Sequence, residues 1–255
     1  MILAVDIGNS NIVVGCMEGM DIVFEARIRT DATKTSDEYC IDLKNILDIY
    51  DVKRSALEGA IVSSVVPQVL NSIKTAIKKL TGKNSLVVGP GLKTGLNIKV
   101  ENPTQVGADL VVGAVAALRE HKPPMIVIDM GTATTMIVLD ETGAFIGGSI
   151  SPGVKISQDA LTNGTALLPG LQLDAPRKAI GRNTIDCMRS GIMLAHACMI
   201  DGMVQRMEAE LGRKAAVVAT GGIARFVLPM CNTSILYDKD LLLKGLAYLY
   251  AENTR

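Results

Sequence analysis

The chain has 255 residues, of which 48% are hydrophobic and 20% are charged, a composition typical of a globular protein with a sizeable core. Its 26 basic and 26 acidic residues leave no net charge, which argues against a nucleic-acid-binding protein that relies on a broad basic surface. The five cysteines form no C-x-x-C pair and there are two histidines, which disfavours a zinc site, a disulfide framework and a histidine-based triad.

The sequence also argues against a membrane protein. No segment approaches the roughly 20 apolar residues that a membrane span requires. The N-terminus lacks the charged region and long apolar core of a signal peptide, because Asp6 arrives at once. We therefore expect a cytoplasmic protein with neither a membrane nor a nucleic acid as partner.

The N-terminal run predicts a buried strand that ends in a carboxylate and a sharp turn. Residues 1–5 are apolar, and Asp6 follows with no basic residue nearby in sequence. A buried carboxylate is costly unless a metal ion or hydrogen-bond donors accompany it. Gly8 would allow a close approach of the backbone or a positive φ, and residues 9–11 add amide and hydroxyl groups. The pattern indicates a metal–phosphate cradle, with an ordinary strand ending in an Asx turn as the alternative.

The rest of the first half predicts a sheet with covering helices. Strands are expected over 12–17 and 22–28, and Thr35 with Glu38 predicts the capping box of a helix. A buried parallel strand over 60–66, a helix from Pro67 to Gly82 and a strand over 85–88 form a β-α-β unit.

A helix with many small residues is predicted over about 105–118. Asp109 is its only charged residue before Arg119. A carboxylate in this place either belongs to a site or complements the positive end of the helix dipole.

The second half repeats the opening pattern. Residues 121–124 break the chain and predict a domain boundary, with domains 1–122 and 123–255. An apolar strand then delivers Asp129, one residue, Gly131 and small polar residues, and further strands follow as they did after Asp6. An internal duplication of a β-β-β-α-β-α unit explains this repeat most simply.

The remaining elements complete the second sheet. Ser151 and Pro152 predict the start of a helix through about Leu161, and Thr184 predicts the N-cap of a long helix ending near Gly212. His196 falls inside that helix, so we expect it to be structural. A buried strand over 215–219 leads to Gly221 and Gly222 at its carboxyl end, where open α/β sheets bind ligands. A strand over 234–237 and a helix over 240–250 end the chain.

The two Asp-x-Gly turns and the strand ending in Gly-Gly resemble the phosphate and adenosine motifs of the actin, Hsp70 and sugar-kinase superfamily. More closely, the chain is similar over essentially its whole length to the type III pantothenate kinases. The matching segments are residues 6–11, 63–67, 88–91, 93–95, 107–109, 129–135, 151–153, 183–184 and 219–222. The resemblance implies an α/β fold of two duplicated ribonuclease-H-like (actin-like ATPase) domains, with mixed sheets and a nucleotide cleft between them.

The resemblance also implies an enzyme that uses ATP to phosphorylate the hydroxyl of pantothenate, giving 4'-phosphopantothenate in the first step of coenzyme A synthesis. It further implies that the protein is a homodimer. Asp109 would be the general base of the reaction. The implied ATP-binding residues are Asp6, Ile7, Gly8, Asn9, Ser10, Asn11, Ile12, Val13, Thr132, Gly221 and Gly222. The implied pantothenate-binding residues are Gly107, Ala108, Asp109, Leu110 and Thr184, the last near a dimer interface.

Two cations follow from the same resemblance. Asp6 would lie near a divalent ion such as Mg²⁺ that accompanies the nucleotide. Asp129 would bind a monovalent cation, K⁺ or NH₄⁺. Because phosphoryl transfer depends mainly on positioning and charge neutralisation, these ions suit a protein with no net positive charge.

Two positions depart from the family pattern around pantothenate. An arginine is common where Leu110 stands, and a tyrosine is common where Val100 stands. Either another donor compensates, such as Arg182 or Asn183, or the affinity for the substrate or its identity differs. The alternatives are therefore a kinase with an altered acceptor and a non-catalytic ATP-binding regulator of the same fold. An actin-like polymer or an Hsp70-type ATPase is disfavoured, since 255 residues leave no room for their extra subdomains.

Overall fold

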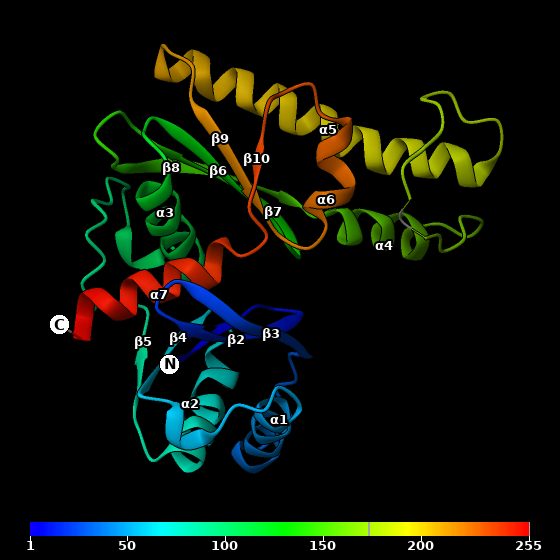
Figure 1. Cartoon of the computed structure of the whole chain (residues 1–255). Coiled ribbons are helices and arrows are strands. Elements are labelled where there is room, and N and C mark those ends of the chain that lie inside the picture. Colours follow the sequence, from blue (N-terminus) through cyan, green and yellow to red (C-terminus); the bar gives the residue numbers. More distant parts are fainter. Residues whose placement is uncertain (173, 255) are drawn as a thin grey trace. The chain divides into compact units, whose positions relative to one another are not determined.

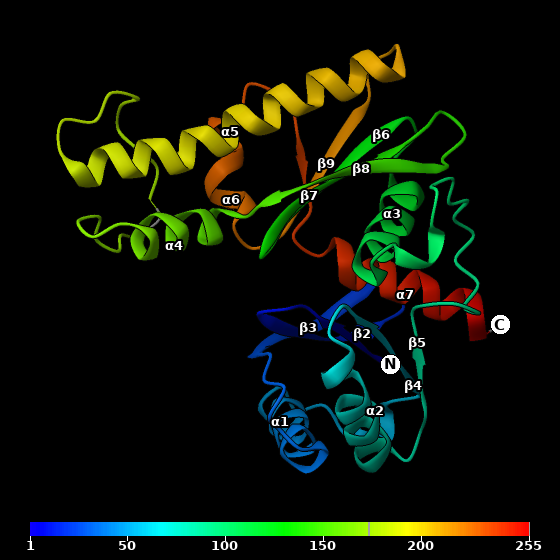
Figure 2. The same cartoon turned by 180° about the vertical axis from the view of Figure 1, so that it is seen from behind.

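The computed structural model describes residues 1–172 and 174–254, which form two compact units. Among the described residues, the first unit comprises 1–96, 101–120 and 240–254, and the second comprises 97–100, 121–172 and 174–239. The chain therefore passes between the units more than once. Figures 1 and 2 show the elements of each unit from two sides.

The first unit contains one mixed sheet and four α-helices among its described residues. In chain order its elements are β1 (Ile2–Ile7), β2 (Asn11–Glu18), β3 (Asp21–Arg29), α1 (Ser36–Ile49), η1 (Arg54–Ala56), β4 (Gly59–Ser64), α2 (Pro67–Thr81), β5 (Ser85–Val87), η2 (Pro103–Gln105), α3 (Ala108–Glu120) and α7 (Leu241–Thr254). The strand order is β3-β2-β1-β4-β5, with β1 antiparallel to β2 and parallel to β4.

Helices cover both faces of this sheet. Leu3, Val5 and Ile7 point to one face and join a core with α1 and α2. The alternate residues point to the other face, which α3 and α7 cover. Gly15 and Gly59 lie on that second face, where a Cβ would overlap α7 side chains. The missing side chains thus let α7 pack closely against the strands.

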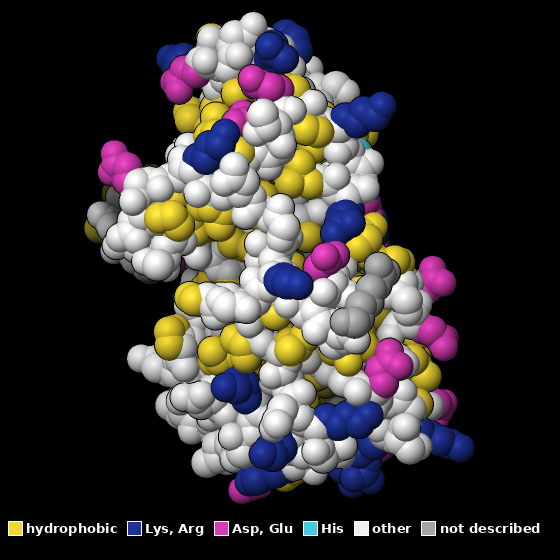
Figure 3. Space-filling view, turned by 90° about the vertical axis from the view of Figure 1, so that its left-hand side faces the viewer, with side chains coloured by type: hydrophobic (Ala, Val, Ile, Leu, Met, Phe, Trp, Pro, Cys, Tyr) yellow, Lys and Arg dark blue, Asp and Glu magenta, His cyan; other side chains and the backbone are white. Residues whose placement is uncertain are grey.

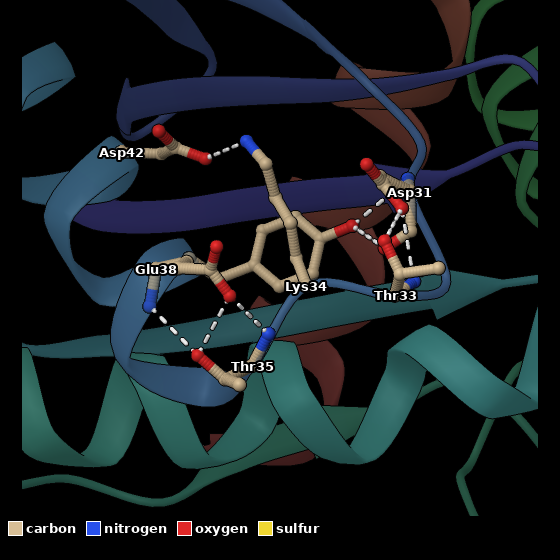
Figure 4. A network of polar contacts seen from close by, with 7 residues as sticks. Asp31, Thr33, Lys34, Thr35, Glu38 and Asp42 are labelled. Carbon is tan, nitrogen blue, oxygen red and sulfur yellow. Dashed lines mark hydrogen bonds and ion pairs between the residues drawn. The ribbon is translucent and has the colours of Figure 1, made fainter.

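A polar network fixes the connection from β3 to α1 (Figure 4). Thr35 and Glu38 form the predicted capping box, and Lys34 Nζ lies 2.8 Å from the Asp42 carboxylate. The Asp31 side chain accepts hydrogen bonds from Thr33, which closes a local turn. These contacts hold the segment that follows Thr30 in one conformation.

The second unit repeats the sheet of the first. Its elements are β6 (Met125–Met130), β7 (Ala133–Leu139), β8 (Phe145–Pro152), α4 (Val154–Gly164), α5 (Thr184–Leu211), β9 (Ala216–Thr220), α6 (Ala224–Val227), η3 (Leu228–Met230) and β10 (Leu236–Tyr237). The order β10-β9-β6-β7-β8 has the same connections and directions as the first sheet, as the predicted duplication requires.

The second core lies between its sheet and helices α5 and α6. Ile126, Ile128 and Met130 of β6 pack with Ile192 and Ile200 of α5 in this core. His196 of α5 is buried, with Nδ1 2.7 Å from the Ile192 carbonyl oxygen and Nε2 3.2 Å from that of Pro152. Its structural role agrees with the sequence prediction.

Two helix starts differ from the prediction. Ser151 and Pro152 end β8, and Gly153 is the N-cap of α4. The N-cap of α5 is Asn183, whose side chain accepts the Asp186 N–H at 2.9 Å, so Thr184 is the first helical residue. Both segments carry capping residues in succession, and local preference alone does not decide which one is used.

The boundaries of the two units are not a single division between residues 122 and 123, which is the division expected from the sequence. Helix α7 belongs to the first unit, where it packs against α3 and the sheet. Residues 97–100 belong to the second unit, because Phe145 N–H donates to the Asn97 carbonyl oxygen at 2.8 Å and Lys99 N–H donates to that of Phe145 at 2.8 Å. No described helix has the length and apolar character needed to cross a membrane.

Candidate functional site

The first Asp-x-Gly turn connects β1 to β2. Gly8 N–H donates to the Asn11 carbonyl oxygen at 3.0 Å, and the side chains of Asn9, Ser10 and Asn11 are exposed. A Cβ on Gly8 would lie 3.1 Å from the same oxygen, and Gly8 does not have a positive φ. Limited space, rather than a left-handed backbone, is therefore the reason for glycine at this position.

Thr30 holds this turn from the end of β3. Its Oγ1 donates to the Gly8 carbonyl oxygen at 2.7 Å, and its N–H donates to that of Ser10 at 3.1 Å. The segment after Thr30 is fixed by the network of Figure 4. The turn is therefore shaped by the fold itself, as expected of a preorganised binding element.

Asp6 lies at the carboxyl end of β1, on the sheet face covered by α3 and α7. Its side chain is 8% exposed, and the strand register places it beside Val13 of β2 and Ser63 of β4. Asp6 has an interaction partner within the chain. Of these two register neighbours, Ser63 is polar and Val13 is apolar. A buried carboxylate is costly unless polar groups accompany it.

Asp109 occupies the first turn of α3, in the same unit. Leu110 N–H donates to its Oδ1 at 2.8 Å, and a Cβ on Gly107 would lie only 2.5 Å from that oxygen. Gly107 therefore leaves the space that the carboxylate occupies. Burial raises the pKa of Asp109 above its usual value of 3.8, against the lowering effect of the backbone hydrogen bonds. A carboxylate of raised pKa accepts a proton more readily.

The second Asp-x-Gly turn connects β6 to β7 in the other unit. Gly131 N–H donates to the Ala133 carbonyl oxygen at 3.0 Å. Gly153 packs against this turn, since a Cβ there would lie 2.3 Å from the Thr132 carbonyl oxygen and 2.8 Å from that of Gly131. Close backbone packing thus supports the turn that contains Thr132.

Asp129 lies one position from the carboxyl end of β6. Its register partners are Thr135 on β7 and Thr220 on β9, and the latter leads into Gly221 and Gly222. The unit thus brings Asp129, Thr132 and the two glycines to the same edge of one sheet. Gly221 also has a packing reason to be glycine, because its φ is +99° and a Cβ would lie 2.5 Å from the Met130 carbonyl oxygen.

Thr184 lies apart from that edge. It is exposed at the start of α5, and this end of the helix projects beyond the sheet in Figures 1 and 2. Arg182 and Asn183, the suggested compensating donors, are exposed beside it, and Asn183 is engaged as the N-cap. Leu110 is half-buried in the first unit, where the resemblance would place a guanidinium.

The described residues include no ready-made cluster of acidic, histidine and cysteine ligands for a metal ion. Over residues 1–172 and 174–254, no three His, Cys, Asp or Glu side chains are grouped so that they could hold one. Magnesium is commonly held by one or two carboxylates together with phosphate oxygens and water. Asp6 beside an exposed polar turn suits that arrangement.

Sequence motifs pointed to the two aspartate turns and to Asp109 but gave no individual role to Thr30, Ser63, Gly153 or Thr220. Thr30 acts through hydrogen bonds to a distant segment, so no local pattern marks it. The other three residues fell within the matching segments 63–67, 151–153 and 219–222.

Comparison with known proteins identifies the family. The sequence model described as type III pantothenate kinase matches residues 2–206. A type III pantothenate kinase of Exiguobacterium sp. is 44% identical over 255 residues, covering 100% of both chains, and that of Moorella thermoacetica is 41% identical, also covering 100% of both. This chain belongs to the type III pantothenate kinase family. As pantothenate kinases, members of this family carry out the first step of coenzyme A synthesis.

Solved structures support the fold of this chain. Component A of (R)-2-hydroxyglutaryl-CoA dehydratase from Acidaminococcus fermentans has a TM-score of 0.58 at 15% identity, covering 100% of this chain and 99% of that one. A ROK hexokinase of Thermus thermophilus has a TM-score of 0.52 at 12% identity, covering 98% and 99%. These likenesses concern the fold alone, and they confirm the predicted duplicated actin-like ATPase architecture.

Proposed function

We propose that this chain transfers the γ-phosphoryl group of ATP to the hydroxyl of pantothenate, with Asp109 as the general base. The observation that carries the role of Asp109 is its environment: a half-buried carboxylate of raised pKa, in space left open by Gly107. Asp109 accepts the hydroxyl proton as the oxygen attacks the γ-phosphorus. The bond from that phosphorus to the bridging oxygen breaks, and ADP leaves.

The first turn, residues 8–11, binds the phosphates of ATP in this proposal. Its exposed side chains and its anchoring by Thr30 support the assignment, and residues Ile7, Ile12 and Val13 shape the strand ends around it. Asp6 orients the divalent cation that accompanies the nucleotide. When bound, that cation neutralises charge on the phosphates. Thr132, Gly221 and Gly222 are the other residues that contact ATP in this proposal.

Asp129 binds the monovalent cation, K⁺ or NH₄⁺, in the same proposal. The support is its oxygen-rich surroundings, because the register places a threonine on each neighbouring strand beside it. Carboxylate and hydroxyl oxygens are suitable ligands for such a hard cation.

Pantothenate contacts the start of α3, residues Gly107 to Leu110, and Thr184 completes the site from a second copy of the chain. The support for a homodimer is a set of exposed apolar residues in the second unit. Ile150, Leu167 and Ile180 are 75%, 89% and 83% exposed. Gly191, Ala195 and Cys198 recur on one exposed face of α5. Covering such residues in a dimer would be favourable, because it removes apolar surface from water.

A cytoplasmic location completes the proposal. All five cysteines are free thiols in the structure, as expected in a reducing compartment.

The function is tested by measuring ADP release from ATP with and without pantothenate, in K⁺ and in Na⁺. We expect turnover that depends on pantothenate and is faster in K⁺, and a K⁺ dependence that Asp129→Ala removes. ADP release that does not depend on pantothenate would be hydrolysis of ATP by water, and it would contradict the kinase proposal. Absence of any turnover would favour a non-catalytic nucleotide-binding protein.

A further inference from the structure

Ser63 is a buried hydroxyl next to the Asp6 carboxylate. It lies on β4, and the parallel register of β1 and β4 pairs it directly with Asp6. Paired residues of neighbouring strands point to the same face of a sheet. Ser63 is 0% exposed, and its Oγ has no hydrogen-bond partner among the residues that the structure describes.

A buried hydroxyl without a partner calls for a physical reason. Buried polar side-chain atoms are almost always hydrogen-bonded, because losing water without a replacement costs free energy. The adjacent Ser64 follows this rule, since its Oγ accepts the Val66 N–H at 3.0 Å and lies 3.2 Å from the Val66 carbonyl oxygen. Alanine would fill the space at position 63 without that cost. The hydroxyl at position 63 therefore points to a partner acquired in another state of the molecule.

The second half of the chain repeats the arrangement. The register of β6 and β9 pairs Asp129 with Thr220, which is 2% exposed. Both halves thus place a buried hydroxyl residue beside the aspartate, on the parallel neighbouring strand. Two such pairs in equivalent places of a duplicated fold favour a shared purpose for the hydroxyl.

We propose that Ser63 is a positioning residue for Asp6. When one carboxylate oxygen of Asp6 turns toward the divalent cation of a bound nucleotide, the Ser63 hydroxyl donates to the other oxygen and fixes the orientation of the carboxylate. This inference rests on the proposed role of Asp6. Carboxylates that bind metals are commonly held by such a second hydrogen bond, and its loss weakens binding about 10- to 100-fold. In the free chain Asp6 has a different partner, which leaves the hydroxyl unengaged.

Two measurements test the inference: the affinity for Mn²⁺–ADP, determined by titration calorimetry, and the unfolding temperature of the free protein. We expect Ser63→Ala to weaken binding of Mn²⁺–ADP about tenfold or more. The same variant should unfold at a temperature equal to or above that of the native chain, because it removes an unpartnered buried hydroxyl. Ser64→Ala is the matched control, and it should lower the unfolding temperature while leaving the affinity for Mn²⁺–ADP unchanged.

A double-mutant cycle shows whether Ser63 affects binding of Mn²⁺–ADP through Asp6 or independently of it. In an Asp6→Asn background, Ser63→Ala should cause no further loss of affinity for Mn²⁺–ADP. An additive loss, native affinity in Ser63→Ala, or a lowered unfolding temperature in Ser63→Ala would each overturn the inference while leaving the kinase proposal in place. A native chain that does not bind Mn²⁺–ADP would overturn the nucleotide role of Asp6 and this inference together.

Discussion

At the scale of single residues, Asp109 combines a cost in stability with a gain in reactivity. Burial raises its pKa above 3.8, so the ionised carboxylate is less favourable in the folded chain than in the unfolded one. Below pH 3.8 the carboxyl group is largely neutral in both states and the difference is absent. As the pH rises through the folded pKa, the penalty on the folded state reaches its full size.

Replacing Asp109 by asparagine should therefore change activity and stability in opposite directions. We expect kcat to fall about 100-fold or more, because the proton acceptor is lost. At neutral pH the unfolding temperature should rise, and this gain should shrink as the pH is lowered toward 3.8. The native chain should also lose activity at low pH with a midpoint above 3.8. Calorimetry and a pH–rate profile measure these effects, and a variant that is less stable at neutral pH would contradict the burial argument.

The sequence predicts the residues of the two Asp-x-Gly turns better than it predicts the residues that hold those turns in place. Asp6 and Asp129 follow apolar strands, and that pattern is local. Thr30 is tied to Gly8 and Ser10 by hydrogen bonds that exist only after β3 has paired with β2. Such contacts depend on tertiary structure, so a single sequence gives no signal for them.

At the scale of elements, the strands and most helix ends follow from local chemistry. The capping box of Thr35 and Glu38 and the start of α2 at Pro67 lie where the sequence places them. The start of α4 is different. Ser151 and Pro152 remain in β8 because the strand pairs with β7 as far as Pro152, and pairing outweighs the local capping preference.

The helix start at Gly153 leads to a prediction for the second turn. Gly153→Ala would place a Cβ 2.3 Å from the Thr132 carbonyl oxygen, so the turn must shift. We expect a loss of about 1–3 kcal/mol in the free energy of unfolding and a higher KM for ATP.

Gly164→Ala at the other end of α4 is the control. A Cβ at that position would meet nothing within 4 Å, and we expect a gain of about 0.5 kcal/mol with unchanged KM. Denaturant unfolding and initial-rate kinetics measure both variants. Equal stability of the two would show that the packing of Gly153 against the turn has no energetic weight.

At the scale of the whole molecule, the duplication is visible in the sequence and in the two sheets of equal strand order. The sequence alone did not place α7, which follows the second sheet in the chain but packs in the first unit. The small residues Gly15 and Gly59 make room for it, yet they lie far from α7 in sequence. Only the folded sheet brings these positions together.

The proposed dimer gives a prediction at this scale. Ala195→Glu puts a charge on the exposed face of α5 without disturbing the helix. We expect sedimentation to show a dimer for the native chain and a monomer for this variant, whose KM for pantothenate should rise. Ala209→Glu, exposed near the end of the same helix, should remain a dimer. A native monomer with full activity would contradict a contribution of Thr184 from a second copy.

In the proposed reaction the chain phosphorylates pantothenate with ATP, and Asp109 is the base. The most direct test is mass spectrometry of the products that the native chain and Asp109→Asn form from ATP and pantothenate. We predict that the native chain forms one phosphorylated pantothenate for each ADP released. The variant should form phosphorylated pantothenate at least about 100-fold more slowly. ADP formed without phosphorylated pantothenate, or a variant as fast as the native chain, would contradict the account.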